Sequence, residues 1–311
     1  MPEVIAIAVA DIHLSHTAPV ARSPELDWYK AQARMLSQLS YLQTEHAVPL
    51  LIAGDLYDRW NAPAELINFA IEWLGGVLAI PGQHDMPYHS IHELRKSAYW
   101  TLMKSSKGDL SGYLGDRVVI ENGVAVVGFP WGEEVEPYAD YQECSGLENA
   151  PSIALIHQYA WTKRIGGYPG APKEQLVHQM EDVLDGYTFA IFGDNHTPFV
   201  AKVGDCTVVN CGCLIPRKID ERKIKPAAWL LCDDGTVEPH YLDTSEDLWM
   251  ETANTIISEQ LEGFATFLDE LGATESDRLD YRDALERYME HNKVGGGVKQ
   301  ELINAMGDGD D

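Results

Sequence analysis

The sequence predicts an α/β protein with a mixed sheet system and helices on the outside. Short continuous apolar runs alternate with amphipathic stretches, and two turn dipeptides mark β-hairpins further along the chain. Hydrophobic residues make up 45% of the 311 residues and charged residues 23%, which is ordinary globular usage. This length fits either two domains of about 150 residues or one large domain with an appendage.

Five continuous apolar runs have the length of strands that are covered on both faces. They are residues 4–10, 48–53, 77–80, 153–156 and 189–192. Two amphipathic stretches predict helices: residues 23–45, beginning at Ser23-Pro24-Glu25 with Leu26 on the apolar stripe, and residues 63–74, ending at Gly75. A strand, helix, strand beginning is typical of an α/β sheet.

The second half of the chain contains the hairpins and then changes in composition. Asn122-Gly123 and Asp234-Gly235 predict tight turns within residues 117–126 and 229–241. Helical stripes follow at residues 245–271 and from residue 274, and a triple glycine at 295–297 precedes an acidic end. We therefore expect a domain at residues 1–243, a helical segment at 244–294, and a flexible acidic tail with a short helix at 295–311.

Charge and composition exclude several classes of protein. The net charge is −26, which argues against a protein that grips nucleic acid unaided, although metal ions could supply positive charge at a site. The longest apolar run is far too short to cross a bilayer, and no signal peptide is recognisable. Five cysteines, an odd number, are typical of reduced thiols, so a cytoplasmic protein without membrane association is expected.

Metal-ligand residue types follow each of the five apolar runs. A single Gly-Asp after a strand is usually a turn, and a single histidine is usually an ordinary surface or core residue. Five such places in one chain instead indicate a common site, because α/β folds gather ligands at the carboxyl ends of their strands. The five segments are Asp11-Ile12-His13, Gly54-Asp55-Leu56-Tyr57-Asp58, Gln83-His84-Asp85, His157 and Asp194-Asn195-His196.

These motifs resemble those of calcineurin-like metallophosphoesterases over about residues 4–240. The segments at residues 51–58 and 156–159 are most similar to the SbcD-type nuclease branch, the partner of an SbcC-type ATPase, which includes phage-encoded recombination nucleases. The protein-phosphatase branch has Asp-Arg-Gly after its second motif and Glu after Gly-Asn-His. Here Asp58-Arg59-Trp60 and Asp85 stand in those places, which argues against that branch.

The resemblance implies a four-layer α/β/β/α metallophosphoesterase sandwich with a small C-terminal helical appendage and two divalent metal ions. Asp55 resembles the carboxylate that bridges the two ions. One ion would be held by Asp11, His13 and His196, and the other by Gln83, His157 and Asp194. His84 would protonate the leaving oxygen, and Asp85 would orient the His84 imidazole. Asp58 would support a metal-ligating histidine without contacting the metal itself.

Two ligand positions depart from the family pattern. Gln83 replaces the usual Asn, and Asp194 replaces the first His of Gly-His-x-His. Asp11, Asp55, Asp194 and a hydroxide would together carry a charge of about −4, which matches two divalent ions. Such an oxygen-rich site favours Mn²⁺ or Mg²⁺ over Zn²⁺. An inactive, degenerate site is the alternative interpretation of these changes.

Two basic clusters stand out in this acidic chain. They consist of Arg217, Lys218, Arg222, Lys223 and Lys225, and of Lys163 and Arg164. Contacts to a phosphate backbone are one interpretation, and a solvated loop paired locally with Asp220 and Glu221 is the other.

The leading functional hypothesis is a Mn²⁺-dependent DNA exo/endonuclease subunit for repair, recombination or phage DNA metabolism. A small-molecule phosphodiesterase or phosphomonoesterase would need the same metal ligands, and a non-catalytic scaffold could use the same fold. The expected partners are DNA and an SbcC-type coiled-coil ATPase. Large apolar side chains at Trp249, Phe264, Phe267 and Leu268 need a covering surface: that ATPase, a second copy of the chain, or the protein's own sandwich.

Overall fold

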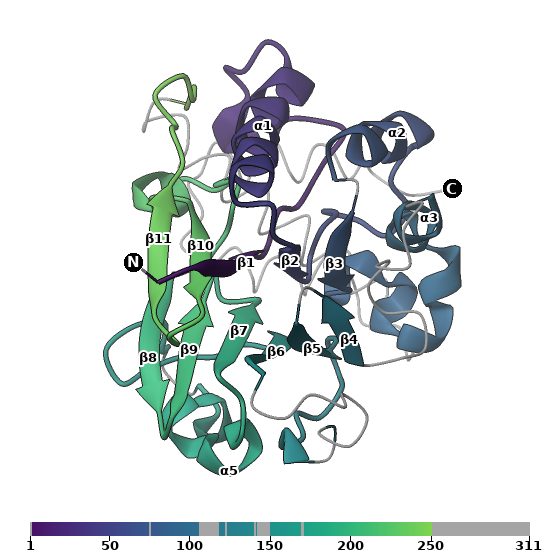
Figure 1. Cartoon of the computed structure of the whole chain (residues 1–311). Helices are drawn as coiled ribbons and strands as arrows, with labels where there is room; N and C mark the ends of the chain where they lie inside the picture. The colour runs from purple at the N-terminus through teal and green to yellow at the C-terminus, as the bar shows by residue number, and fades with distance from the viewer. Residues whose placement is uncertain are drawn as a thin grey trace, which may run out of the picture. The chain divides into compact units, whose positions relative to one another are not determined.

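The computed structural model describes residues 2–74, 76–105, 118–121, 123–139, 141, 150–168 and 171–250 (Figure 1). The chain divides into two compact units, Met1–Trp249 and Met250–Asp311. The predicted C-terminal helices and acidic tail lie outside the described residues from position 251 onward. Residues 245–250 are described and form a turn and irregular backbone, so the prediction of a helix beginning at Ser245 is wrong for these six positions.

The first sheet has the strand order β11-β10-β1-β2-β3. Its strands are β1 (Val4–Val9), β2 (Leu50–Ala53), β3 (Val77–Ile80), β10 (Ala227–Cys232) and β11 (Val237–Tyr241). Strands β1, β2 and β3 are parallel, whereas β10 pairs antiparallel with both β1 and β11. The three parallel strands therefore end at the same edge of the sheet.

The second sheet has the order β4-β5-β6-β7-β9-β8. Its strands are β4 (Val118–Glu121), β5 (Val124–Phe129), β6 (Ser152–His157), β7 (Phe189–Gly193), β8 (Phe199–Val203) and β9 (Cys206–Asn210). The four central strands are parallel, and β4 and β8 close the two edges antiparallel. This mixed pattern follows from the two hairpins β4–β5 and β8–β9, which flank parallel strands.

The helices lie on the outer faces of the two sheets (Figure 1). The helices α1 (Trp28–His46), α2 (Ala64–Trp73) and α3 (Ala98–Ser105) cover the first sheet, and the short α5 (Glu181–Leu184) lies beyond the second. Short 3₁₀ helices occur at Val20–Arg22, Gln83–Asp85, Pro87–His89, Ile91–Lys96, Lys173–Gln175, Val177–Gln179 and Asp220–Lys223.

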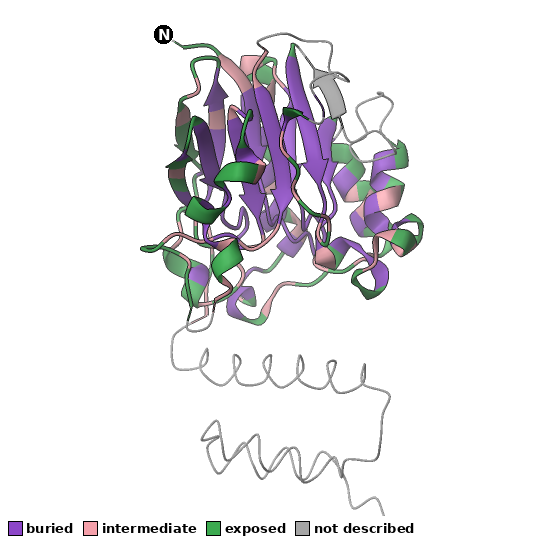
Figure 2. Ribbon diagram, turned by 90° about the horizontal axis from the view of Figure 1, so that it is seen from below, coloured by how far each residue is buried: buried purple, intermediate pink, exposed green. Residues whose placement is uncertain are grey.

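Three apolar clusters separate these layers. One lies between the two sheets and includes Ala8, Leu51, Ile153 and Ile191. The second packs Leu36 and Leu39 of α1 against the first sheet, and the third packs Leu184 of α5 against the second. Figure 2 shows the buried strands flanked by helices whose outer faces are exposed. The two stacked mixed sheets with outer helices confirm the predicted α/β sandwich.

Most predicted elements are present in the described residues, but several boundaries differ. All five apolar runs form strands, and both predicted hairpins pair as expected. Helix α1 begins five residues later than predicted, because the Asp27 carboxylate accepts a hydrogen bond from the Lys30 backbone N–H and caps the helix there. Leu26 precedes the helix and is exposed. The β8–β9 hairpin and α3 were not predicted from the sequence.

Residues 244–249, at the end of the first unit, pack against the rest of that unit through Arg22. The Arg22 guanidinium is buried and pairs with Glu25 at 2.8 Å and with Asp247 at 2.9 Å. It lies 5.3 Å from the ring centroid of Trp28 and 4.7 Å from that of Trp249. It also donates hydrogen bonds to the carbonyl oxygens of Leu248 and Pro216. One side chain thus connects the end of this unit with the segment that begins at Pro216.

None of the helices in the described part of the chain has the length and apolar character that crossing a membrane requires. The four cysteines described, Cys206, Cys211, Cys213 and Cys232, are buried and free, as predicted for reduced thiols.

Candidate metal centre

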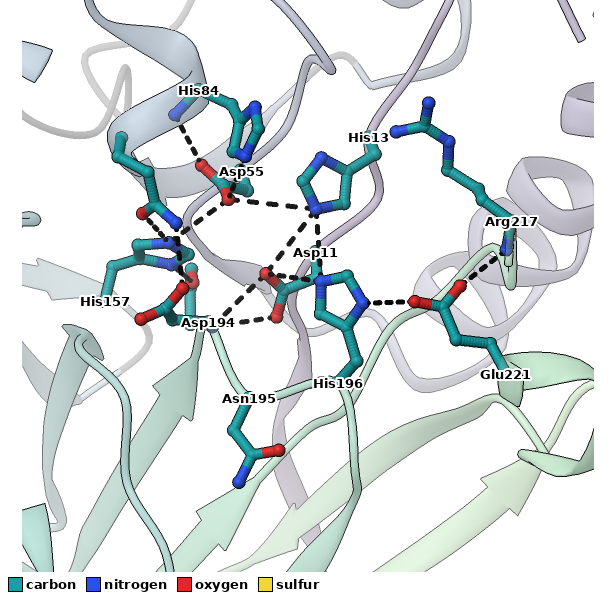
Figure 3. Close-up of polar contacts among 12 residues, drawn as sticks. Asp11, His13, Asp55, His84, His157, Asp194, Asn195, His196, Arg217 and Glu221 are labelled. Atoms are coloured by element: carbon teal, nitrogen blue, oxygen red, sulfur yellow. Dashed lines mark hydrogen bonds and ion pairs between the residues drawn. The ribbon is translucent and has the colours of Figure 1, made fainter. Parts of the chain in front are cut away.

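The polar segments that follow β1, β2, β3, β6 and β7 meet at one edge of the sandwich (Figure 3). They converge because the parallel strands of each sheet end at the same edge. The seven predicted metal ligands all lie in this cluster, connected by hydrogen bonds or by close contacts of ligand atoms. They are Asp11, His13, Asp55, Gln83, His157, Asp194 and His196.

Four of these residues have left-handed backbone conformations. The φ angle is +49° at Asp11, His13 and Asp55, and +80° at Asp194. Such conformations in residues other than glycine cost of order 1–3 kcal/mol each and persist where surrounding structure enforces them. Each occurs just after a strand, where the turn of the chain directs the side chain toward the centre of the cluster.

Two glycines make room for the side chains in the cluster. A Cβ atom at Gly54, whose φ is +84°, would collide with the His157 ring, and one at Gly82 would collide with the Asp55 carboxylate. The Gly-Asp after β2 and the Gly-Gln after β3 are therefore parts of the site, and not only turns.

The first ligand group consists of Asp11, His13 and His196. The Nε2 atoms of His13 and His196 are 3.3 Å apart, and Asp11 Oδ1 lies 3.9 Å from the first and 3.8 Å from the second. His196 Nδ1 donates a hydrogen bond to Glu221 Oε1 at 2.6 Å. Because Nδ1 carries the proton, the unprotonated Nε2 is turned toward the group, which is the arrangement a metal-ligating imidazole needs.

The second group consists of Asp11, Asp55 and His157. His157 Nδ1 donates to the Ala53 carbonyl at 2.7 Å, which turns its Nε2 toward Gln83 Oε1 at 2.8 Å and Asp55 Oδ2 at 3.4 Å. The Gln83 amide in turn donates to Asp194 Oδ1 at 2.8 Å. The longer Gln side chain thus lies between the two other ligands predicted for this site.

Asp55 joins the two groups. Its Oδ1 accepts a hydrogen bond from the His84 backbone N–H, whereas its buried Oδ2 has no hydrogen-bond donor among the described residues. That Oδ2 lies 3.7 Å from His13 Nε2 and 3.4 Å from His157 Nε2. A buried carboxylate oxygen without a donor, placed between two imidazole nitrogens, fits a position that bridges two cations.

The electrostatics of the cluster also fit cations. Burial, reinforced by the carboxylates of Asp55 and Asp194, raises the pKa of Asp11 to about 7. Burial alone would lower the pKa of His157, but the charges of Asp55, Asp11 and Asp194 outweigh it and raise that pKa to about 10. Burial lowers the pKa of His13 well below its usual range, so its imidazole is neutral. Two divalent ions would offset this concentration of carboxylates.

His84 lies at the rim of the cluster and is its most exposed imidazole. Its Nδ1 donates to the main-chain carbonyl of Asp58 at 2.9 Å, and its Nε2 is 4.0 Å from Asp55 Oδ2. The side chain is 43% exposed. His84 can therefore present Nε2 to a substrate that enters from solvent.

The predicted role of Asp85 is wrong. Its carboxylate accepts hydrogen bonds from three backbone N–H groups, those of Leu56, Tyr57 and Gly82, at 2.9–3.1 Å. It does not orient the His84 imidazole, because the Asp58 carbonyl occupies that Nδ1. Asp85 instead ties the segment after β2 to the segment after β3, which bear Asp55 and Gln83.

Asp58 also has partners other than those expected. Its main-chain carbonyl orients His84, and its carboxylate forms an ion pair with Arg217. The described residues include no hydrogen bond from the Asp58 side chain to a predicted metal-ligating histidine. A carboxylate oxygen of Asp58 nevertheless lies within 4.8 Å of a ring nitrogen of His13 and of His84, so the predicted support of a histidine by Asp58 stays a prediction.

The basic residues fall into two groups beside the centre. Arg217 is partly buried against Asp58, while Lys218, Arg222 and Lys223 are exposed in and before the turn Asp220–Lys223. Lys163 and Arg164 are exposed in a turn whose Gly166 backbone lies against the Asn195 side chain. In the sequence, Asn195 lies between the predicted ligands Asp194 and His196. The segment that carries each group therefore contacts a segment that bears predicted metal ligands.

The part that Glu221 plays was not predicted from the sequence. Its position among basic residues suggested only a local partner for neighbouring cations, whereas its carboxylate bonds His196, 25 residues earlier in the chain. Cys213 lies close enough to form a third group with these two residues. Burial raises the pKa of the Cys213 thiol well above its usual range. This group is therefore best described as a protonated thiol next to the hydrogen-bonded pair of His196 and Glu221.

Comparison with known proteins identifies a family whose model matches this chain. Residues 6–198 match the model of the family described as calcineurin-like phosphoesterase. No curated protein sequence matches the chain.

The chain is also similar to several solved structures, at low sequence identity. The sulfate thiohydrolase SoxB of Thermus thermophilus, in complex with glycerol, is 12% identical with a TM-score of 0.49, over 86% of this chain and 62% of that one. A Staphylococcus aureus protein assigned as a 5′-nucleotidase, in complex with α-ketoglutarate, is 11% identical with a TM-score of 0.46, over 83% and 58%. A metallophosphoesterase from Sphaerobacter thermophilus is 13% identical with a TM-score of 0.37, over 84% and 94%. The chain thus spans about three fifths of the length of the first two structures.

The family match covers more than half of the chain and contains all seven predicted ligands. The chain belongs to the calcineurin-like phosphoesterase family.

Proposed function

We propose that this metallophosphoesterase is a metal-dependent DNA nuclease of the SbcD type. The observation that carries the proposal is the position of its exposed cations. Lys218, Arg222 and Lys223 belong to the segment whose Glu221 bonds the ligand His196, so positive charge adjoins the metal centre in a chain of net charge −26. A polymeric phosphodiester would use both features, since cations contact its backbone while the centre acts on one phosphate.

The chemistry divides between the centre and its rim. Two divalent ions, when bound, would acidify a water molecule and offset the negative charge of the phosphate. Asp11, His13 and His196 would hold one ion, Gln83, His157 and Asp194 the other, and Asp55 would contact both. The oxygen-rich ligand set favours Mn²⁺ or Mg²⁺.

His84 is the group that would hand a proton to the leaving oxygen. The Asp58 carbonyl accepts the proton of Nδ1, so the proton that is transferred resides on Nε2 of the protonated imidazole. The exposure of the side chain lets Nε2 reach a leaving group on the solvent side of the centre.

A small-molecule phosphodiesterase is the second candidate, and the strongly negative net charge favours it. An acidic protein repels the DNA backbone within about a Debye length of its surface, and the many phosphates of DNA add to this repulsion, whereas a small diester carries only one negative charge. The partner predictions, an SbcC-type ATPase or a second copy of this chain, concern the C-terminal helices and stay predictions.

Cleavage assays with Mn²⁺ on linear DNA and on bis-(p-nitrophenyl) phosphate test the proposal. Replacing Lys218, Arg222 and Lys223 with Ala should impair DNA cleavage while leaving turnover of the small diester unchanged. Lys30→Ala, an exposed lysine on the outer helix α1, is the matched control. Hydrolysis of the small diester without any cleavage of DNA would favour the second candidate, and failure on both substrates with metals bound would refute both.

A further inference from the structure

Glu221 contacts both the metal centre and the segment that carries the basic residues. We propose that Glu221 is a positioning residue: it sets the tautomer of His196 and at the same time orders the backbone of residues 216–224. The first part concerns metal binding alone, and the second part, which concerns DNA, rests on the proposed function.

Both oxygens of the buried Glu221 carboxylate are used. Oε1 accepts the His196 Nδ1–H at 2.6 Å. Oε2 accepts the backbone N–H groups of Arg217 at 2.7 Å and Lys218 at 2.9 Å. Three donors from two segments therefore meet on one carboxylate, and only an ionised carboxylate can accept from all three with both its oxygens.

The bond to His196 decides which ring nitrogen faces the metal centre. Because a carboxylate can only accept, Nδ1 keeps the proton and Nε2 presents its lone pair toward His13 and Asp11. A carboxylate partner also raises the basicity of the ligand nitrogen. The His196 side chain is 26% exposed, in contrast to the nearly inaccessible His13, so this bond contributes strongly to its orientation.

The bonds to the backbone extend the effect across the site. With the N–H groups of Arg217 and Lys218 held, the Arg217 guanidinium reaches the Asp58 carboxylate. The carbonyl of Asp58 orients His84. The segment thus contacts the predicted ligand His196 through Glu221. Through Arg217 it also contacts Asp58, whose carbonyl orients the proposed proton donor His84.

Substitution by glutamine separates the two parts. In Glu221→Gln the amide oxygen has to face the two backbone N–H donors, so the amide NH₂ faces His196. Nδ1 must then accept, the proton moves to Nε2, and the ligand lone pair is lost. We expect Mn²⁺ affinity at one of two sites to fall about 10–100-fold. The salt dependence of DNA binding should stay unchanged.

Two further variants complete the design. Glu221→Ala removes all three bonds, so it should lose the same metal affinity and also flatten the salt dependence of DNA binding, by about 0.9 in slope for each DNA phosphate that the segment no longer neutralises. Asp220→Asn removes one negative charge from the neighbouring exposed position. It keeps the side-chain oxygen that accepts a hydrogen bond from the Glu221 backbone N–H at 3.1 Å. It should change neither measurement.

The measurements use the full chain. Electron paramagnetic resonance of free Mn²⁺ gives the number and affinity of sites, ¹⁵N NMR gives the His196 tautomer, and DNA binding is titrated with salt in EDTA. Two unaltered Mn²⁺ sites, or an unaltered His196 tautomer, in Glu221→Gln would overturn the first part, and an unaltered salt slope in Glu221→Ala would overturn the second. If the unmodified protein binds no DNA, the proposed function is wrong, but the Mn²⁺ and tautomer measurements still test the effect of Glu221 on His196.

Discussion

Gly82 offers a sharp test of the metal centre, because alanine fits its backbone but not its surroundings. The φ angle of Gly82 is −91°, which any residue adopts, so Gly82→Ala introduces no backbone strain. The added methyl group would lie against Asp55 Oδ1 and only 2.6 Å from His157 Nε2. The whole effect of the substitution therefore comes from one carbon atom placed between two predicted ligands.

The size of the effect follows from the contact distance. Nonbonded heavy atoms approach to about 3.5 Å, so the His157 ring must move by roughly 0.9 Å and Asp55 by more, or the segment after β3 must shift instead. A displacement of about 1 Å at a reacting centre costs about 10²-fold in rate. Overpacking of this kind also costs about 1–3 kcal/mol of stability.

The assay is Mn²⁺-dependent hydrolysis of bis-(p-nitrophenyl) phosphate, together with the number of Mn²⁺ ions bound per chain. Gly132→Ala is the control, because a Cβ atom there meets open space although its φ of +86° strains the backbone. We expect Gly82→Ala to lose about 10²-fold or more in rate and to bind metal more weakly, and Gly132→Ala to keep both. Full activity of Gly82→Ala would refute the placement of Asp55 and His157 around the metals.

Four further predictions concern other parts of the protein. His84→Ala should lose about 10²–10⁴-fold in hydrolysis while two ions remain bound, as metal analysis of the purified protein would show; loss of an ion would make His84 a ligand. Asp194→His should shift the activity ranking from Mn²⁺ toward Zn²⁺ in a metal titration, and an unchanged ranking would contradict the role of its charge. Mn²⁺ at 100 times its dissociation constant should add about 2.7 kcal/mol per site to the free energy of unfolding in urea, and EDTA should abolish the gain. Arg22→Met should cost about 3–5 kcal/mol in the same urea measurement, against about 1 kcal/mol for the more exposed Arg34→Met; equal losses would show that burial of Arg22 is unimportant.

The sequence predicted the strands and the polar segments at their ends well, because both depend on local patterns. The apolar runs form β1, β2, β3, β6 and β7, and the residues just beyond them converge because parallel strands end together. Periodicity alone could not place the start of α1, since the capping bond of Asp27 decides it. Strand β8 was missed because three of its five residues are exposed or half-exposed, so it has no continuous apolar run.

The partners of the site residues were harder to predict than their positions. Asp85 directly follows His84, which suggested a pair, yet its carboxylate turns inward to three backbone N–H groups. Glu221 lies among basic residues, which suggested local pairing, yet its oxygens reach His196 as well as its neighbours' backbone. The hydrogen-bond partners of such residues depend on which loops lie close together in the folded protein, and the spacing of residues in the sequence does not predict this.

The contacts of Arg22 also determine how the first unit would respond to mechanical load. Tension applied to the chain beyond Trp249 would pass first into the Arg22 ion pairs with Asp247 and Glu25 and into the stacking of Trp249 on the guanidinium. The same guanidinium is bonded to the Pro216 carbonyl, next to Arg217 and five residues before Glu221. A pull on this joint would therefore act on a side chain that is also bonded to the start of the segment beside the metal centre.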